Sequence, residues 1–270
     1  MNILFTVCGR AGSKGCKNKN LKDYLETSLV YYTLAAIDLY RERYPVKDGR
    51  MDVVLNTDSE ELIRIVTAQK RVPVSVIHRD GSLGGDSVPK VSVIADCLQR
   101  MEKENGVSYD VVVDLDLTSP LRTVQDVRNL IERKMSRNDT DVVYSVTESR
   151  RNPYFNMVIE ENGFFHRAIV SDFTARQQAP VMYDMNASLY AYSPSALRTK
   201  EHRSFFNTNT DAIIMKDTAV LDIDSEDDFE LISVIGAYFY QKYPPFGEVQ
   251  NRAKEIGGGV VSHGKEKSGN

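Results

Sequence analysis

Cysteine is scarce in this chain of 270 residues, and its three cysteines are Cys8, Cys16 and Cys97. An odd number at these spacings fits neither a zinc site nor a disulfide framework. We therefore expect reduced thiols, which are typical of cytosolic proteins. Long apolar runs are also missing, because no stretch approaches the roughly 18 consecutive apolar residues that a membrane-spanning helix needs. The N-terminus lacks the pattern of a signal peptide, so the expected compartment is the cytoplasm.

An excess of positive charge is absent as well. Asp and Glu outnumber Lys and Arg by 38 to 34, which gives a net charge of −4 and an isoelectric point of about 5.7. This balance disfavours nonspecific binding to nucleic acid or to a membrane, but it allows a local basic pocket for a phosphorylated ligand. With 41% hydrophobic and 27% charged residues, the chain fits one large α/β domain or one such domain with an excursion.

Short apolar runs alternate with segments of helical periodicity through the first 150 residues. The segments that predict strands are 2–7, 52–56, 73–78, 110–116 and 141–147. The segments that predict helices are 28–42, 88–104 and 124–135. Such alternation is typical of a mostly parallel sheet with helices on both faces.

The alternation breaks after Thr147. Residues 148–187 carry two prolines and an Asn-Gly pair between short strand-like runs, which predicts an excursion from the domain. Two strands and a last helix are expected after it, over 188–193, 212–216 and 226–242.

The expected organisation is one domain over residues 1–243 that includes the excursion. A tail over 244–270 contains three consecutive glycines and ends in polar residues. This composition predicts a mobile segment without a role in function.

The first loop, residues 9–20, reads GRAGSKGCKNKN and follows the first strand, where open α/β sheets bind ligands. Its glycines let backbone N–H groups approach phosphate oxygens, and its cations offset their charge, so we expect a polyphosphate site. The loop is neither a dinucleotide fingerprint, because Ala11 takes the middle position, nor a P-loop, because Lys14 precedes a glycine. The alternative interpretation is a solvated basic loop.

A second motif, DLTSPLR over residues 116–122, ends a central strand. Thr118 and Ser119 offer hydroxyls at the same sheet edge as the first loop, and Arg122 is expected to position the turn or to reach an anion. A structural role is compatible with this one, since Thr123 is placed to cap the following helix.

The third motif is LDIDSE over residues 221–226. On an extended segment Asp222 and Asp224 point the same way, and two adjacent carboxylates repel unless a cation lies between them. Hard oxygen ligands near phosphate indicate Mg²⁺. The alternative is that Asp224 or Ser225 caps the last helix.

Together these motifs resemble the CMP-sialic acid synthetase family, a branch of the nucleotide-sugar cytidylyltransferases. The resemblance covers about residues 2–240. Its ordered motifs are the first loop with Arg10, Ser13, Lys14, Gly15, Lys19 and Asn20, the turn 57–59, the segment 118–122, residues 176–180 with 186–188, and residues 222–226.

The resemblance implies a Rossmann-like fold of the nucleotide-diphospho-sugar transferase type, and a homodimer in which the excursion leans over the partner's site. The implied reaction joins CMP from CTP to a nine-carbon nonulosonic acid and releases pyrophosphate. The residues implied for CTP are Arg10, Ser13, Lys14, Lys19, Asn20, Asp86 and Ser87. Those implied for the sugar are Asp116, Thr118, Ser119, Arg176, Gln178 and Asn186. The resemblance implies catalytic roles for Arg10, Lys14, Lys19 and Asp116. It implies that Asp222 and Asp224 bind Mg²⁺.

Two departures leave the sugar open between a sialic acid and a legionaminic-type acid. Asp116 stands where the family has glutamine, and no lysine follows Asn152-Pro153. A cation for the sugar carboxylate must then come from elsewhere, the candidates being Arg150, Arg151 and Arg176. No general base has a motif around it, and Asp116 or Asp222 acting through water is the open option.

Other functions fit parts of the pattern. One alternative is a CMP-Kdo-type or other sugar nucleotidyltransferase. Another is a nucleotide-binding subunit without catalysis, which would not need the aspartate pair.

Overall fold

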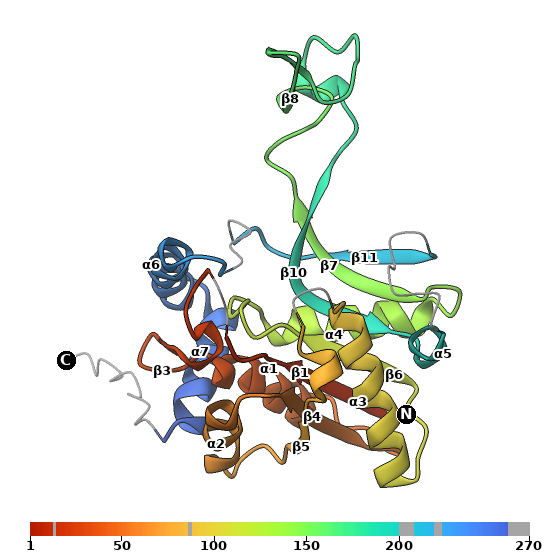
Figure 1. Ribbon diagram of the computed structural model, residues 1–270, viewed down its shortest axis with the longest axis vertical. Helices are drawn as coiled ribbons and strands as arrows, with labels where there is room; N and C mark the ends of the chain where they lie inside the picture. Colours follow the sequence, from red (N-terminus) through yellow and green to blue (C-terminus); the bar gives the residue numbers. More distant parts are fainter. Residues whose placement is uncertain (13–14, 86–87, 200–207, 219–222, 259–270) are drawn as a thin grey trace, which may run out of the picture.

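A seven-stranded sheet runs through the body of the protein (Figure 1), with strand order β11-β7-β10-β6-β1-β4-β5. This computed structural model describes residues 1–12, 15–85, 88–199, 208–218 and 223–258. The strands are β1 (Ile3–Cys8), β4 (Met51–Thr57), β5 (Ser75–His78), β6 (Val111–Leu115), β7 (Val142–Glu148), β10 (Tyr183–Tyr192) and β11 (Thr210–Ile214). Only β10 within this sheet runs antiparallel to its neighbours, β6 and β7, so the mostly parallel sheet expected from the sequence is confirmed.

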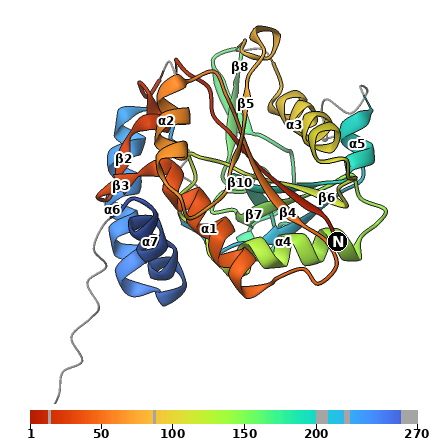
Figure 2. The ribbon, with the colours of Figure 1, turned by 90° about the horizontal axis from the view of Figure 1, so that it is seen from below.

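Helices cover both faces of the sheet, as Figure 2 shows. They are α1 (Leu29–Arg43), α2 (Glu60–Ala68), α3 (Lys90–Asn105), α4 (Val124–Ser136), α5 (Pro194–Arg198), α6 (Glu226–Lys242) and α7 (Pro244–Ile256). One apolar core joins the sheet to α1, α2, α4, α6 and α7, and a smaller core joins the other face to α3 and α5. The central strands are therefore buried on both sides, which explains why β1 and β6 are mostly apolar.

The mobile tail expected from residue 244 is wrong for residues 244–256, which form α7. Phe246, Val249, Ala253 and Ile256 are buried at helical spacing and join the larger core. The Pro244-Pro245 pair obscures the start of this helix in the sequence, yet proline is well tolerated in a first helical turn. Residues 259–270 lie outside the described part of the chain.

Residues 149–182 leave the body as a projecting arm between β7 and β10 (Figure 1). Its strands β8 (Val158–Glu161) and β9 (Phe164–Arg167) pair with each other and are exposed along their whole length. The first residues of β10 pair with the end of β7, so the sheet continues to the base of the arm, earlier than the strand expected from 188.

Cys8, Cys16 and Cys97 are all free, as expected. Among the described residues, no helix has the length and apolar character that crossing a membrane requires.

Candidate functional site

A cavity of about 360 Å³ opens where β1, β5 and β6 end. This is the carboxyl edge of the parallel strands, where open α/β sheets bind ligands. Six side chains singled out from the sequence line it: Arg10, Lys19, Asn20, Asp116, Thr118 and Asp224. Two further cations, Arg79 and Lys90, also line it, so its described walls carry more positive than negative charge.

The first loop is held at both ends by polar side chains. The backbone N–H of Ala11 donates to Asp58 Oδ1 at 2.7 Å, and Asn20 Nδ2 donates to the carbonyl of Arg10 at 3.1 Å. Gly12 has a φ of 71°, in the left-handed region that glycine adopts at little cost. Asn20 and Asp58 therefore fix the path of the loop, and Arg10 projects from it into the cavity wall.

Lys19 and Asp224 meet across the mouth of the cavity. Lys19 Nζ donates to the carbonyl of Ile223 at 2.6 Å and to Asp224 Oδ1 at 3.3 Å. A Cβ atom at Gly15 would overlap the carbonyl oxygen of Asp224, so the loop lies directly on this segment. The first and third motifs thus form one rim of the cavity.

Asp224 is not the N-cap of the last helix, whereas Ser225 is. Ser225 Oγ accepts from the N–H of Asp228 at 3.1 Å, and the Asp228 carboxylate accepts from the N–H of Ser225 at 2.8 Å, a reciprocal capping box. The carboxylate of Asp224 is 78% exposed and faces Lys19 instead. Of the two roles open from the sequence, capping belongs to Ser225, and Asp224 is available to the cavity.

Asp116 is held in one position on the cavity floor. Its Oδ1 accepts from the N–H and the hydroxyl of Thr118, at 2.8 and 2.7 Å, and its Oδ2 accepts from Lys90 Nζ at 2.7 Å. Burial alone would raise the pKa of Asp116, but the Lys90 ammonium and the bonds from Thr118 outweigh burial and hold the pKa well below its usual range. Asp116 is therefore ionised and a weak base, which disfavours the option that it takes up a proton through water.

Arg122 supports this floor from beneath and does not line the cavity. Its fully buried guanidinium donates to the carbonyls of Ser119 and Asp116. Burial lowers the pKa of Arg122 to about 10. Thr123 caps α4 through a capping box with Asp126, as the sequence suggested. The second motif thus combines a rigid turn with a helix start.

Four residues expected at the sugar do not line the cavity of their own chain. Ser119 Oγ donates to the carbonyl of Asn186 at 3.5 Å, beside the irregular part of β10. Arg176 and Gln178 lie on the arm, in a short 3₁₀ helix (Arg176–Gln178). There Gln178 Oε1 accepts from the N–H of Thr174, and Arg176 donates to backbone carbonyls at the base of the arm.

Five expected site residues lie outside the described part of the chain: Ser13, Lys14, Asp86, Ser87 and Asp222. Neighbours of these gaps, Gly15, Gly85, Val88 and Asp224, all line the cavity.

The sequence interpretation missed Arg79 and Lys90. Arg79 follows β5 directly and is fixed by Asn56, whose side-chain and backbone oxygens accept from it at 2.9 and 3.0 Å. Lys90 begins α3 and spans from that helix to Asp114 and Asp116 at the end of β6. Only their positions in the sequence could have indicated them. Each lies where a strand ends or a helix begins at the carboxyl edge of the sheet.

Comparison with known proteins decides the family. A family model described as "Cytidylyltransferase" matches residues 4–242. The chain belongs to the cytidylyltransferase family. It is accordingly a nucleotidyltransferase, as the sequence motifs predicted.

The similar proteins include CMP-N,N'-diacetyllegionaminic acid synthase of Campylobacter jejuni, which is 33% identical over 86% of this chain and 94% of its own length. Post-translational flagellin modification protein B of Campylobacter coli is also 33% identical, over 86% of this chain and 94% of its own length. N-acylneuraminate cytidylyltransferase of Streptococcus agalactiae is 28% identical over 89% of this chain and 54% of its own length.

A solved structure with a similar fold is a CMP:2-keto-3-deoxy-manno-octonic acid synthetase complexed with CTP. It has a TM-score of 0.59 and 14% identity, and the match covers 88% of this chain and 99% of that one. At this identity the likeness concerns the fold alone, and it confirms the expected nucleotide-sugar transferase architecture.

Proposed function

We propose that this cytidylyltransferase transfers CMP from CTP to the anomeric hydroxyl of a nine-carbon nonulosonic acid of the legionaminic or sialic type. The observation that carries the proposal is the cation-lined cavity at the carboxyl edge of β1, β5 and β6, with Asp224 at its rim. The names of the similar proteins supply the substrate class. The sugar oxygen attacks the α-phosphorus, the bond to the bridging oxygen breaks, pyrophosphate leaves and the hydroxyl proton is released.

Arg10 and Lys19 are assigned to the triphosphate, together with Ser13 and Lys14 of the same loop. Cations and backbone N–H groups fixed before the reaction stabilise charge that develops on phosphate oxygens. Asn20 contributes by holding the carbonyl of Arg10. Arg79 adds a cation to the same cavity. Asp86 and Ser87, which lie outside the described residues, are assigned to the nucleoside.

Asp222 and Asp224 are assigned to Mg²⁺. The described part of the site fits a hard cation, because the Asp224 carboxylate is exposed at the rim and is not used as a helix cap. Mg²⁺ takes one or two carboxylates together with phosphate oxygens and waters, and it would neutralise charge on the phosphates of CTP.

The sugar is assigned to the β6 and β10 side of the cavity. Asp116 and Thr118 line that wall, and the next residue, Ser119, donates to the carbonyl of Asn186 on β10. Since its pKa is held low, Asp116 is assigned to accepting a hydrogen bond from the sugar rather than its proton.

The function is tested by supplying each of CTP, ATP, GTP and UTP with Mg²⁺ and a panel of sugars, and measuring pyrophosphate. The panel contains N,N'-diacetyllegionaminic acid, N-acetylneuraminic acid and 2-keto-3-deoxy-manno-octonic acid. We expect release to depend on CTP and on one of the two nine-carbon acids. Equal turnover of the four nucleotides, or preference for the eight-carbon acid, would overturn the proposal.

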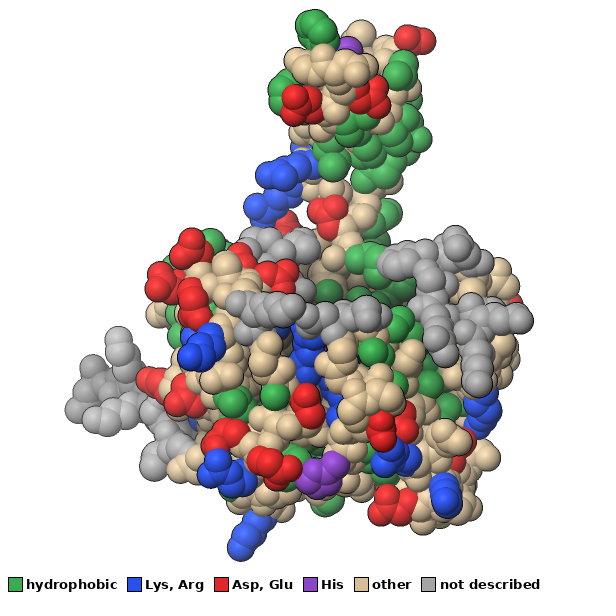
Figure 3. All heavy atoms as spheres, viewed as in Figure 1, with side chains coloured by type: hydrophobic (Ala, Val, Ile, Leu, Met, Phe, Trp, Pro, Cys, Tyr) green, Lys and Arg blue, Asp and Glu red, His purple; other side chains and the backbone are tan. Residues whose placement is uncertain are grey.

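We further propose that the arm joins two copies of the chain in a homodimer. Its exposed apolar side chains include Phe164 and Phe165, both 69% exposed, and Val170, 91% exposed. Figure 3 shows the apolar surface of the arm standing clear of the body. A large exposed apolar patch of this kind normally marks an interface, and an isolated two-stranded hairpin is marginally stable without one. Arg176 and Gln178 do not line the cavity of their own chain, so in such a dimer we expect them to serve the cavity of the partner.

A further inference from the structure

Lys90 links two carboxylates that the sheet presents side by side. Asp114 lies in β6 and Asp116 just beyond its end, so their side chains project from the same face. Lys90 Nζ lies 2.7 Å from Asp114 Oδ2 and 2.7 Å from Asp116 Oδ2. Asp114 is fully buried and also accepts from the hydroxyl of Thr6 at 2.8 Å. One lysine thus ties α3 to the cavity floor.

Hydrogen bonds from the described residues leave one acceptor position of Asp116 open. A carboxylate offers about four acceptor positions. Two on Oδ1 are taken by Thr118, and one on Oδ2 is taken by Lys90. The side chain of Asp116 is 24% exposed and lines the cavity, so the free position is open to a ligand there.

The place of Asp116 in the sheet points to the sugar rather than the nucleotide. β6 lies between β1, which carries the basic loop, and β10, which carries Asn186. The N–H of Asp116 donates to the carbonyl of Ser188 at 3.1 Å, which connects it to the β10 side. Lys90 approaches from α3, on the other side of Asp116 from this backbone bond.

We propose that Lys90 is a positioning residue that orients the Asp116 carboxylate to accept one hydrogen bond from a hydroxyl or amide N–H of the sugar. The inference rests on the proposed function and names a determinant of sugar binding within it. Lys90 acts through Asp116 and is not itself assigned to the substrate.

Other charged and titratable groups face this cluster from the neighbouring elements. They are Cys8 at the end of β1, Tyr192 on β10 and Arg122 after β6. A hydrogen bond with Cys97 and burial raise the pKa of Cys8, and burial raises that of Tyr192, so both are neutral near pH 7. The guanidinium of Arg122 donates its hydrogen bonds to the backbone carbonyls of Ser119 and Asp116. Lys90 is therefore the cation that contacts the Asp116 carboxylate among the described residues.

The pKa of Asp116 determines how the KM for sugar should depend on pH. In the wild type the pKa of Asp116 lies below its usual range, so we expect the carboxylate to stay ionised near neutral pH and its protonation to add nothing to the pH dependence of the KM for sugar. In Lys90→Met the same carboxylate keeps its burial and its Asp114 neighbour, which raise its pKa, and its two hydrogen bonds from Thr118, which lower it. It loses its cation, so its pKa rises relative to the wild type. The KM for sugar should then rise as the pH falls.

The test measures KM for sugar, KM for CTP and kcat by pyrophosphate release between pH 5.5 and 8.5, with unfolding followed in parallel. The loss of a charge-assisted hydrogen bond predicts a KM for sugar about ten- to a hundredfold higher in Lys90→Met, with KM for CTP little changed. An unchanged KM for sugar, or a change confined to CTP, would overturn the inference.

The double variant Lys90→Met/Asp114→Asn separates positioning from stability, because it removes the buried charge that Lys90 otherwise offsets. We expect it to recover thermal stability while its KM for sugar stays raised at least about tenfold, since Oδ2 of Asp116 still lacks its partner. A wild-type KM in this variant would show that Lys90 only offsets Asp114.

Lys134→Met is the matched control, since Lys134 is a buried lysine on α4 that lines no described part of this cavity. It should change stability without changing KM. A wild type that releases no pyrophosphate with any sugar would overturn the proposed function itself. An active wild type with unaltered Lys90→Met kinetics would overturn only the role of Lys90.

Discussion

Asp224 and Lys19 form an ion pair at the mouth of the cavity. The side chain of Asp224 is 78% exposed and that of Lys19 is 21% exposed. An ion pair this exposed contributes little to stability. Substitutions at these residues therefore report on ligand binding more than on folding.

Asp224→Asn should lower turnover severely and raise the Mg²⁺ concentration needed for half-maximal rate. Its melting temperature should stay close to that of the wild type, because Ser225 and Asp228 carry the cap. The matched control is Asp227→Asn, an exposed acid in the first turn of α6 that does not line the cavity. Full activity of Asp224→Asn at millimolar Mg²⁺ would remove Asp224 from the proposed metal site.

Lys19→Met should raise the KM for CTP by about ten- to a hundredfold, the cost of one charge-assisted contact to phosphate. Initial rates of pyrophosphate release at varied CTP measure it. Lys17→Met is the control, since Lys17 is exposed on the same loop and does not line the cavity. Equal effects of the two substitutions would mean that the loop acts only through its net charge.

The site residues that could be predicted from the sequence belong to motifs whose residue types indicate the ligand. The basic loop, Thr118 and Asp224 belong to such motifs, and they line one cavity. Arg79 and Lys90 could not be predicted from the sequence, because a single cation after a strand or at the start of a helix belongs to no recognisable motif. The partner of Lys90 is a pair of aspartates 24 and 26 residues further on, and only the folded sheet brings them together.

At the scale of elements, α6 packs closely against the short hairpin of β2 (Asp23–Tyr24) and β3 (Thr27–Ser28). Tyr24 is fully buried, and its hydroxyl donates to the carbonyl of Ile232 at 3.0 Å. A Cβ at Gly236 would overlap that hydroxyl. The glycine is required by this contact rather than by the helix.

Gly236→Ala should therefore destabilise the fold by roughly 1–3 kcal/mol, the usual cost of overpacking. Helix propensity alone predicts the opposite sign, a gain of about 1 kcal/mol. Urea unfolding measures the difference. Tyr24→Phe removes the hydroxyl, so alanine at position 236 should cost less in that background. The same cost in both backgrounds would show that the contact is not the cause.

The helices and strands that could be predicted from the sequence are those whose buried residues recur at a regular spacing. α6 has the bounds expected for it, and β1, β4 and β6 differ from expectation by one residue at each end. α7 was missed because two prolines and a glycine interrupt its apolar spacing. The start of β10 was missed because exposed residues begin it, and its pairing with β7 is what makes it a strand.

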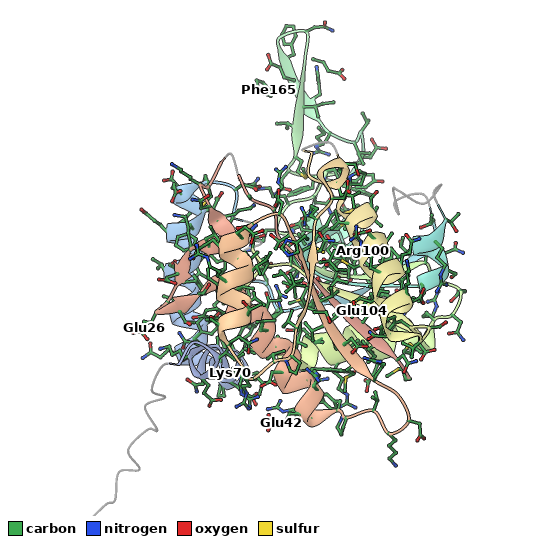
Figure 4. The ribbon with its side chains drawn as sticks, turned by 60° about the horizontal axis from the view of Figure 1, so that its bottom comes forward. Glu26, Glu42, Lys70, Arg100, Glu104 and Phe165 are labelled. Carbon is green, nitrogen blue, oxygen red and sulfur yellow. The ribbon has the colours of Figure 1, made fainter. Side chains whose placement is uncertain are left out.

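At the scale of the whole molecule, the arm separates an apolar surface from the body. Figure 4 places Phe165 near the tip of the arm, away from the helices and the sheet. Replacing Phe164 and Phe165 with aspartate should convert a dimer of twice 30.5 kDa into a monomer, as measured by sedimentation equilibrium. Val234→Asp is the control, because Val234 is 72% exposed but lies on α6 of the body. A monomeric wild type at micromolar concentration would end the dimer proposal.

Mixing two impaired variants tests whether the arm serves the partner's cavity. Lys19→Met damages the cavity wall, and Arg176→Ala damages the arm, whose Arg176 does not line the cavity of its own chain. If the arm acts across the dimer, one site of a mixed dimer combines both defects and the other site combines an intact wall with an intact arm. With CTP near the wild-type KM, co-refolding the two variants should then give more pyrophosphate release than either variant alone. If Arg176 served its own chain, each site would carry one defect and the mixture would stay as slow as its components. Restoration that disappears when Phe164 and Phe165 are also changed to aspartate would tie the complementation to the arm interface.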